Sequence, residues 1–284
     1  MSTLPVFGIG ILLMGSWFLG KMAAGFHLPS ITGFILAGML LGPGMLGMVH
    51  SDLNHELGII TEVTLAVIAL EIGSEFSAAK LRRTGRPVII ITAVQLLATF
   101  LAVTLAMYFS GIAGLPMAAI LASIATATAP AATVAIVREL KARGPFVDHL
   151  YGIVALDDAG CVLIFSLVAA LTGRALGGAE IGAGTALLQG LCEIVGSLAL
   201  GVAVGLGLRL LTGRNSKSNE IYITTLGLLC IMAAVASVTG FSSLLAGMAA
   251  GAVLTNSPGG SRRVVKTLEQ ISPPMYAAFF AIAG

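Results

Sequence analysis

Charged residues are scarce in this sequence, and their scarcity excludes an ordinary soluble domain. Only 10% of the 284 residues are Asp, Glu, Lys or Arg, whereas 57% are hydrophobic and the mean hydropathy is +1.01. Apolar runs of about 17 to 25 residues recur along nearly the whole length, and each is long enough to cross roughly 30 Å of hydrocarbon as a helix. The predicted fold class is therefore an all-α, polytopic membrane protein.

Cysteines and catalytic motifs are also scarce. The three cysteines, Cys161, Cys192 and Cys230, lie in apolar stretches without metal-ligand spacing, so we expect small core residues. The sequence has no Walker loop, zinc-ligand spacing, nucleophile elbow or patch of basic and aromatic residues. We therefore expect no enzyme activity, no cofactor and no nucleic-acid partner. No basic residue precedes Lys21, so the first apolar run is expected to remain as a helix rather than a signal peptide.

Charge clusters and Gly or Pro residues divide the chain into apolar segments. We predict membrane spans at residues 5–24, 30–48, 56–73, 87–110, 116–138, 147–172, 184–208, 220–239 and 242–255, with a tenth span beginning near Pro274. The chain, residues 1–284, is predicted to form a single transmembrane domain.

Basic residues are distributed unequally between the two ends of these spans. Threading the spans alternately through a bilayer puts thirteen of the fifteen basic residues on one face. They are Lys80, Arg82, Arg83, Arg86, Arg138, Lys141, Arg143, Arg209, Arg214, Lys217, Arg262, Arg263 and Lys266. Because short loops rich in Lys and Arg stay in the cytoplasm, we expect a multi-pass protein of the cytoplasmic membrane with its basic loops inside and its N-terminus outside.

Two adjacent carboxylates, Asp157 and Asp158, lie in the middle of the predicted span 147–172. About ten residues of helix, or roughly 15 Å, separate them from the cytoplasmic end of that span. Ionisable side chains are costly at this depth, so each marks a candidate functional site. Neighbouring helical residues point about 100° apart, so the two carboxylates face different neighbours and can have different roles.

The preceding span has the sequence TATAPAAT at the same depth. Pro130 has no N–H group, and in a continuous helix its ring clashes with the carbonyl four residues earlier. Helix propensity is lowered further by three β-branched residues of this stretch, Thr126, Thr128 and Thr133. We therefore predict a discontinuous helix over 116–138 that breaks at Ala129 and Pro130. Unwound backbone at this depth is tolerated where it lines a polar cavity, and its carbonyls can hold a cation.

Three glutamates are weaker candidates. Glu71 is expected near the cytoplasmic end of its span, where it can reach the interface or pair with Arg82 or Arg83. Glu62 and Glu193 lie one or two turns inside their helices, where each could line a cavity or cap a helix contact.

Three Gly-x-x-x-Gly spacings could allow close helix approach. They begin at Gly38, Gly201 and Gly247. With 36 glycines in the chain, such spacings arise often by chance.

Several stretches match one family in order. The stretch from Leu28 to Gly38, followed by Leu41-Gly42-Pro43, resembles the second-helix signature of monovalent cation:proton antiporter family 2, which includes sodium/proton antiporters and potassium efflux proteins. Residues 69–75 resemble the end of its third helix, the threonine-proline stretch resembles its broken helix, and the aspartate pair resembles its ion-binding helix. Residues 241–247 resemble its ninth helix, and residues 279–284 resemble its tenth.

The resemblance implies a sodium/proton antiporter-like helical bundle that exchanges a monovalent cation, Na⁺ or K⁺, for protons. Asp158 would be the carboxylate that binds either the proton or the cation, and Asp157 would mark an electrogenic member. Thr126 and Thr128 would supply oxygen ligands. Beyond the transported ions no cofactor is implied, and the partners would be the lipid bilayer and a second copy of the chain in a homodimer.

The family fold has a second inverted repeat with its own broken helix, and this sequence ends at Gly284 before reaching one. The resemblance therefore implies a C-terminally truncated member. Two alternatives stay open, namely a truncated, non-transporting membrane subunit or paralogue, and a sodium-coupled organic-solute symporter of similar architecture. The choice between Na⁺ and K⁺ and the identity of any basic partner of Asp157 also stay open.

Overall fold

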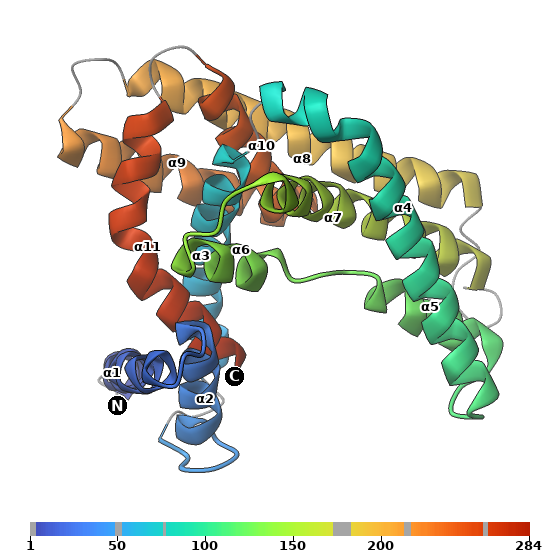
Figure 1. Cartoon of the computed structure of the whole chain (residues 1–284), viewed down its shortest axis with the longest axis horizontal. Helices are drawn as coiled ribbons and strands as arrows, with labels where there is room; N and C mark the ends of the chain where they lie inside the picture. Colours follow the sequence, from blue (N-terminus) through green and yellow to red (C-terminus); the bar gives the residue numbers. More distant parts are fainter. Residues whose placement is uncertain (1–3, 49–52, 76–77, 173–182, 213–216, 258–260) are drawn as a thin grey trace.

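The described part of the chain consists of helices and the segments that connect them. A computed structural model describes residues 4–48, 53–75, 78–172, 183–212, 217–257 and 261–284. Its helices are α1 (Leu4–Gly25), α2 (Ser30–Leu41), α3 (Leu53–Ser74), α4 (Ala78–Phe109), α5 (Leu115–Ala125), α6 (Pro130–Glu139), α7 (Pro145–Thr172), α8 (Ala183–Leu211), α9 (Ser218–Thr239), α10 (Ser243–Asn256) and α11 (Ser261–Ala283) (Figure 1). The predicted all-α class is confirmed.

The outer surface of these helices suits hydrocarbon. Five of the described helices, namely α1, α4, α7, α8 and α9, are long and apolar enough to cross a membrane, and α2, α5 and α10 are shorter apolar helices. Large apolar side chains such as Val238 and Leu210 are more than 80% exposed, and burial against lipid or another apolar surface is favourable for such side chains. Cys192 and Cys230 are exposed, contrary to our expectation of core residues, whereas Cys161 is half-buried.

The last helix begins earlier than the predicted start near Pro274. It starts at Ser261 and continues through both of its prolines. Its first turns are amphipathic, because Val264 and Leu268 are buried whereas Lys266 is exposed. A search for apolar runs does not find such a segment, since polar residues alternate with the buried ones.

The helices form two bundles that α8 connects. We call α1, α2, α3, α9, α10 and α11 the large bundle, and α4, α5 and α7 the small bundle (Figure 1). Helix α8 packs against α9 and α10 of the large bundle and against α7 of the small bundle. The two halves of the interrupted segment separate, because α5 packs on α4 and α7 whereas α6 contacts α2, α3 and α7.

Glycines allow α10 to pack closely between α3 and α8. A Cβ atom on Gly251 of α10 would overlap the carbonyl oxygen of Leu70 in α3. A Cβ atom on Gly201 of α8 would likewise overlap the carbonyl oxygen of Ala246 in α10. Two of the three Gly-x-x-x-Gly spacings therefore serve helix packing on the two faces of α10.

Helix α3 lies at the centre of the large bundle. Its residues 66–72 are each at most 1% exposed, and this run includes Glu71. A charged side chain in such surroundings needs a partner of opposite charge, which directs attention to the helices packed around it.

Candidate functional site

The interruption between α5 and α6 is built by local chemistry. Helix α5 ends at Ala125, and the hydroxyl of Thr126 donates to the carbonyl of Ser123 at 2.7 Å. Pro130 is the first residue of α6, a position where its missing N–H group leaves no helical hydrogen bond unmade. Ala129, immediately before it, is extended, with φ −87° and ψ 99°. The four residues from Thr126 to Ala129 therefore connect two half-helices.

Asp157 of α7 holds this connecting segment. Its side chain is 0% exposed, and its Oδ2 atom accepts hydrogen bonds from the backbone N–H of Thr128 at 3.1 Å and from the Thr128 hydroxyl at 2.6 Å. Its Oδ1 atom accepts a third hydrogen bond from the side-chain amide of Gln95 in α4 at 3.0 Å. Both carboxyl oxygens of Asp157 are thus bonded to the protein.

Asp158, the next residue, has a different environment. Its Oδ2 atom is buried and has no hydrogen-bond partner among the described residues. Asp158 lies about thirteen residues into α7, or roughly 20 Å from the first residue of that helix. A buried acceptor without a donor is rare in folded proteins, and it marks a place where a proton or a cation fits.

The structure brings only part of the predicted set together. Thr128 and Asp157 are bonded, whereas the hydroxyl of Thr126, which is 1% exposed, donates within its own helix turn. Thr133 is half-buried and lies inside α6. Sequence reasoning missed Gln95, although it is the only carboxamide in the predicted span 87–110 and that isolation was a usable signal.

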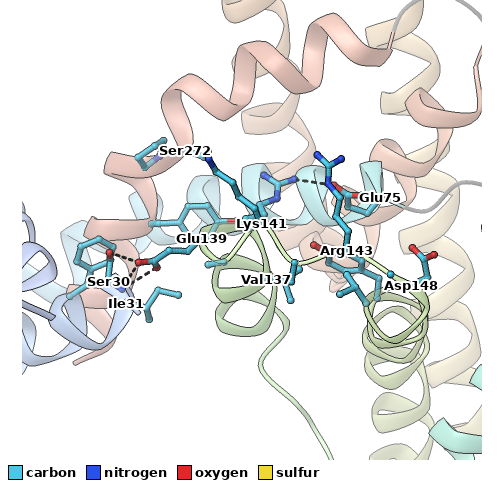
Figure 2. A pocket seen from close by; sticks show the side chains of 18 residues that line it. Ser30, Ile31, Glu75, Val137, Glu139, Lys141, Arg143, Asp148 and Ser272 are labelled. Carbon is cyan, nitrogen blue, oxygen red and sulfur yellow. Dashed lines mark hydrogen bonds and ion pairs between the residues drawn. The ribbon is translucent and has the colours of Figure 1, made fainter. Parts of the chain in front are cut away.

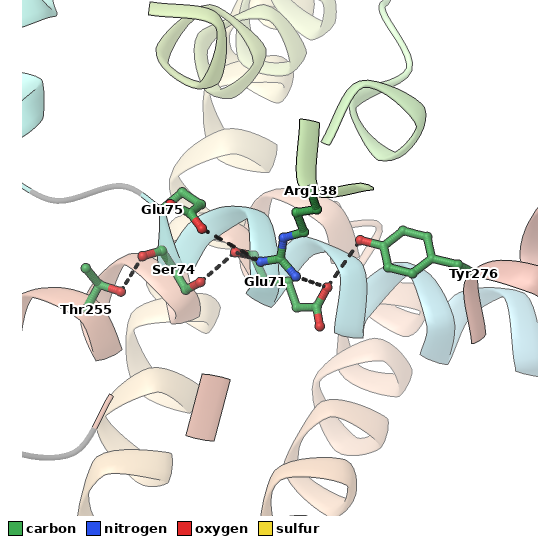
Figure 3. Close-up of polar contacts among 6 residues, drawn as sticks. All are labelled: Glu71, Ser74, Glu75, Arg138, Thr255 and Tyr276. Carbon is green, nitrogen blue, oxygen red and sulfur yellow. Dashed lines mark hydrogen bonds and ion pairs between the residues drawn. The ribbon is translucent and has the colours of Figure 1, made fainter. Parts of the chain in front are cut away.

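A second buried cluster lies on α3, α6 and α11 (Figure 3). The Oε2 atom of Glu71 is 2.6 Å from Nη1 of Arg138 and accepts a hydrogen bond from the Tyr276 hydroxyl at 3.2 Å. Glu71 is fully buried and pairs with Arg138. It therefore does not reach the membrane–water interface, which was one of its two predicted positions. The side chains of Arg82 and Arg83, the partners first considered for Glu71, lie outside the described residues.

Two cavities approach the interrupted helix. The first, of about 990 Å³, has walls from α2, α6, α7 and α11 and from Glu75, the residue after α3, and it includes basic and acidic side chains such as Arg143 and Asp148 (Figure 2). The second, of about 680 Å³, is lined by Ala127 of the connecting segment, by Cys161 of α7 and by Glu193 of α8. Glu193 thus lines a cavity, one of its two expected roles, whereas Glu62 is exposed on α3.

Comparison with known proteins supports the same class. The family model described as the transmembrane region of sodium/hydrogen exchangers matches residues 9–284. The chain belongs to the sodium/hydrogen exchanger family. The predicted resemblance to a monovalent cation:proton antiporter family is therefore confirmed.

Individual relatives of this exchanger-family chain are more distant. K(+) efflux antiporters 4 and 6 of Arabidopsis thaliana are 28% and 27% identical over 282 and 269 residues. Each of these alignments covers 89% of this chain and 42% of the relative, so the chain spans about two fifths of the length of the curated relatives it matches.

A solved structure shares the fold. The sodium proton antiporter MjNhaP1 from Methanocaldococcus jannaschii at pH 8 superposes with a TM-score of 0.76 at 17% identity, over 99% of this chain and 69% of that chain. The predicted sodium/proton antiporter-like bundle is thus confirmed.

Proposed function

We propose that this chain takes part in the exchange of a monovalent cation for protons across a membrane, and that Asp158 holds either ion. The observation that supports this most directly is the Oδ2 atom of Asp158, which is buried without a hydrogen-bond partner among the described residues. Family membership supports the class of activity.

The chemistry of exchange follows from that environment. A bare carboxylate is poorly stabilised away from water, so a proton or a cation must compensate its charge. Because the two ions would bind the same oxygen atoms, each excludes the other. Mutually exclusive binding is what couples the two fluxes in an antiporter.

Asp157 is proposed to hold the connecting segment beside this site. Its two carboxyl oxygens already accept three hydrogen bonds from Thr128 and Gln95. The connecting segment can then supply further cation ligands, namely the backbone carbonyls and the hydroxyl lone pairs of Thr126 and Thr128. The carboxyl end of α5 adds partial negative charge at the same place.

The transported cation is proposed to be Na⁺ or K⁺. The curated relatives are K(+) efflux antiporters by name, and the structural neighbour is a sodium proton antiporter. We further propose an electrogenic exchanger that works as a homodimer in the cytoplasmic membrane with its basic loops inside. The unequal distribution of Lys and Arg supports that orientation.

The proposal is tested with the full-length gene product in liposomes that carry a pH gradient and a pH-sensitive dye. Addition of Na⁺, Li⁺ or K⁺ is expected to dissipate the gradient, and Asp158→Asn is expected to abolish this response. The control variant, Glu62→Gln, removes an exposed carboxylate of α3 and should respond like the wild type. Because protons compete with the cation, the half-saturating cation concentration should rise as the pH falls.

Two results would contradict the proposal. If none of the three cations dissipates the gradient, a non-transporting membrane subunit becomes the better interpretation. If Asp158→Asn exchanges ions as fast as the wild type, the exchanged ions do not bind Asp158. If the pH gradient is dissipated only when an organic solute is added with the cation, a sodium-coupled symporter becomes the better interpretation.

A further inference from the structure

Glu139, the last residue of α6, bonds to the start of α2 in the large bundle. Its carboxylate accepts hydrogen bonds from the backbone N–H of Ser30 at 3.0 Å to each oxygen and from the Ser30 hydroxyl at 2.7 Å (Figure 2). A carboxylate at a helix N-terminus satisfies otherwise unpaired N–H groups and interacts favourably with the helix dipole. Glu139 therefore caps α2 from a different helix.

Arg138, the preceding residue, makes the second connection. Its guanidinium group lies 2.6 Å from the Glu71 carboxylate and donates to the Glu71 carbonyl at 3.3 Å (Figure 3). The side chains of Arg138 and Glu71 are 22% and 0% exposed, and Tyr276 of α11 donates to the same carboxylate oxygen. A pair this buried, with its further hydrogen bonds, holds α6 firmly against α3 and α11.

Both connections start from residues that line the same cleft. The cavity of about 990 Å³ has Ser30, Glu75 and Tyr276 of the large bundle on one wall. On the other wall lie residues of α6 and of α7 in the small bundle, including Tyr151. Among the described residues, these two contacts and a longer ion pair between Arg138 and Glu75 at 4.0 Å join α6 to the large bundle, while α5 stays packed on the small bundle.

We propose that Arg138 and Glu139 form a two-point lock, in which Arg138 binds Glu71 and Glu139 binds Ser30, that opens and closes during exchange. This inference rests on the function proposed above. Arg138 acts as a positioning residue, because its bond to Glu71 sets where α6 lies and hence where the connecting segment meets Asp157. Arg138 and Glu139 both line the cleft of about 990 Å³, which is large enough to admit water around these two side chains when the lock opens.

A cross-linking experiment tests whether the lock opens. Ser30→Cys and Glu139→Cys are introduced into a protein whose native cysteines are replaced by Ser, and the new pair is joined by a short bis-methanethiosulfonate reagent. The reduced protein should exchange ions, and the cross-linked protein should lose about tenfold or more of that rate, because a covalent bond holds the two helices together. Reduction should restore the rate.

The outcomes separate the lock from the proposed function. If the cross-linked protein exchanges ions at the rate of the reduced protein, the contact does not open and the lock is refuted. If the wild type itself fails to exchange ions, the proposed function fails, and the lock is then judged by the labelling experiment below.

The labelling experiment needs no transport activity. Ala135→Cys, placed in the same background without native cysteines, puts a reporter on the wall of the cleft, and its reaction with a charged maleimide measures how open the cleft is. The double variant Glu71→Gln with Arg138→Gln removes both charges, so neither is left buried alone. We expect labelling to become about tenfold faster or more in this variant, since a charge-assisted hydrogen bond shifts a two-state equilibrium by at least that factor.

The matched control is Arg143→Gln, which removes an exposed arginine from the same cleft and should leave labelling unchanged. Equal labelling rates in the double variant and the wild type would refute the lock. The single variant Arg138→Gln should also unfold more readily than the double variant, because it leaves the Glu71 carboxylate buried without its arginine.

Discussion

Replacement of Thr128 by valine separates two roles for its hydroxyl group. The Thr128 hydroxyl donates to the fully buried Asp157 carboxylate at 2.6 Å. Thr128→Val keeps the shape of the side chain and the backbone N–H bond but removes this donor. An ordinary hydrogen bond between membrane helices contributes only about 0.6 kcal/mol. This acceptor is charged and has no access to water, so we expect a loss of about 1.5–3 kcal/mol in the free energy of unfolding.

The assay is unfolding in mixed detergent micelles, measured together with cation-dependent dissipation of a pH gradient. Thr128→Ser keeps the donor and should stay close to the wild type. Thr104→Val is the matched control, because the Thr104 hydroxyl bonds, among the described residues, only to the Phe100 carbonyl of its own helix, and it should change the unfolding free energy by less than about 0.5 kcal/mol. The reasoning is refuted if Thr128→Val unfolds like the wild type and raises only the half-saturating cation concentration, since the hydroxyl would then serve the cation rather than Asp157.

Two further predictions use the same unfolding assay. Gln95→Leu removes the donor to Oδ1 of Asp157 and should destabilise the protein by about 1.5–3 kcal/mol, so an unchanged unfolding curve would mean that this bond contributes nothing. Gly251→Ala forces a methyl group against the Leu70 carbonyl and should cost about 1–3 kcal/mol. In its control, Gly227→Ala in α9, the added methyl group meets no described atom within 4 Å outside the backbone of its own helix, so this variant should be neutral or stabilise by up to about 1 kcal/mol. Equal losses in both variants would contradict the packing argument.

Helix boundaries could be predicted from the sequence where a helix begins and ends with its apolar run, but not where the helix continues into charged residues. The predicted span 220–239 agrees closely with α9, which begins at Ser218 and ends at Thr239. Helix α4 begins at Ala78, well before the predicted span 87–110. Helix α11 begins at Ser261, well before the predicted start near Pro274. Both early segments carry charged residues, so apolar periodicity does not detect them, although backbone hydrogen bonds continue through them.

The sequence predicted some residues of the candidate site, but not which of them contact one another. Depth in the membrane drew attention to Asp157, Asp158 and Thr128 from sequence alone. Gln95 and Arg138 were not recognised, because one polar residue in an apolar span and one arginine at a helix end have many possible neighbours. Their partners lie 62 and 67 residues away in the chain, and only helix packing brings them together.

The sequence by itself determined what depends on composition and on short-range chemistry. The excess of apolar residues dictates a helical membrane protein, because backbone groups in hydrocarbon must bond within their own helix. Pro130 is enough to begin a new helix, because it cannot donate the bond that would continue the old one. These consequences need no knowledge of any distant residue.

Only the tertiary structure decided how the acidic residues differ. Asp157 and Asp158 are identical and adjacent, yet one accepts three hydrogen bonds and the other has a buried oxygen without a partner among the described residues. Glu71 is buried against an arginine from another helix, whereas Glu62 on the same helix is exposed. The energy of a carboxylate depends on the donors and cations within a few ångströms, and packing between helices determines which groups are that close.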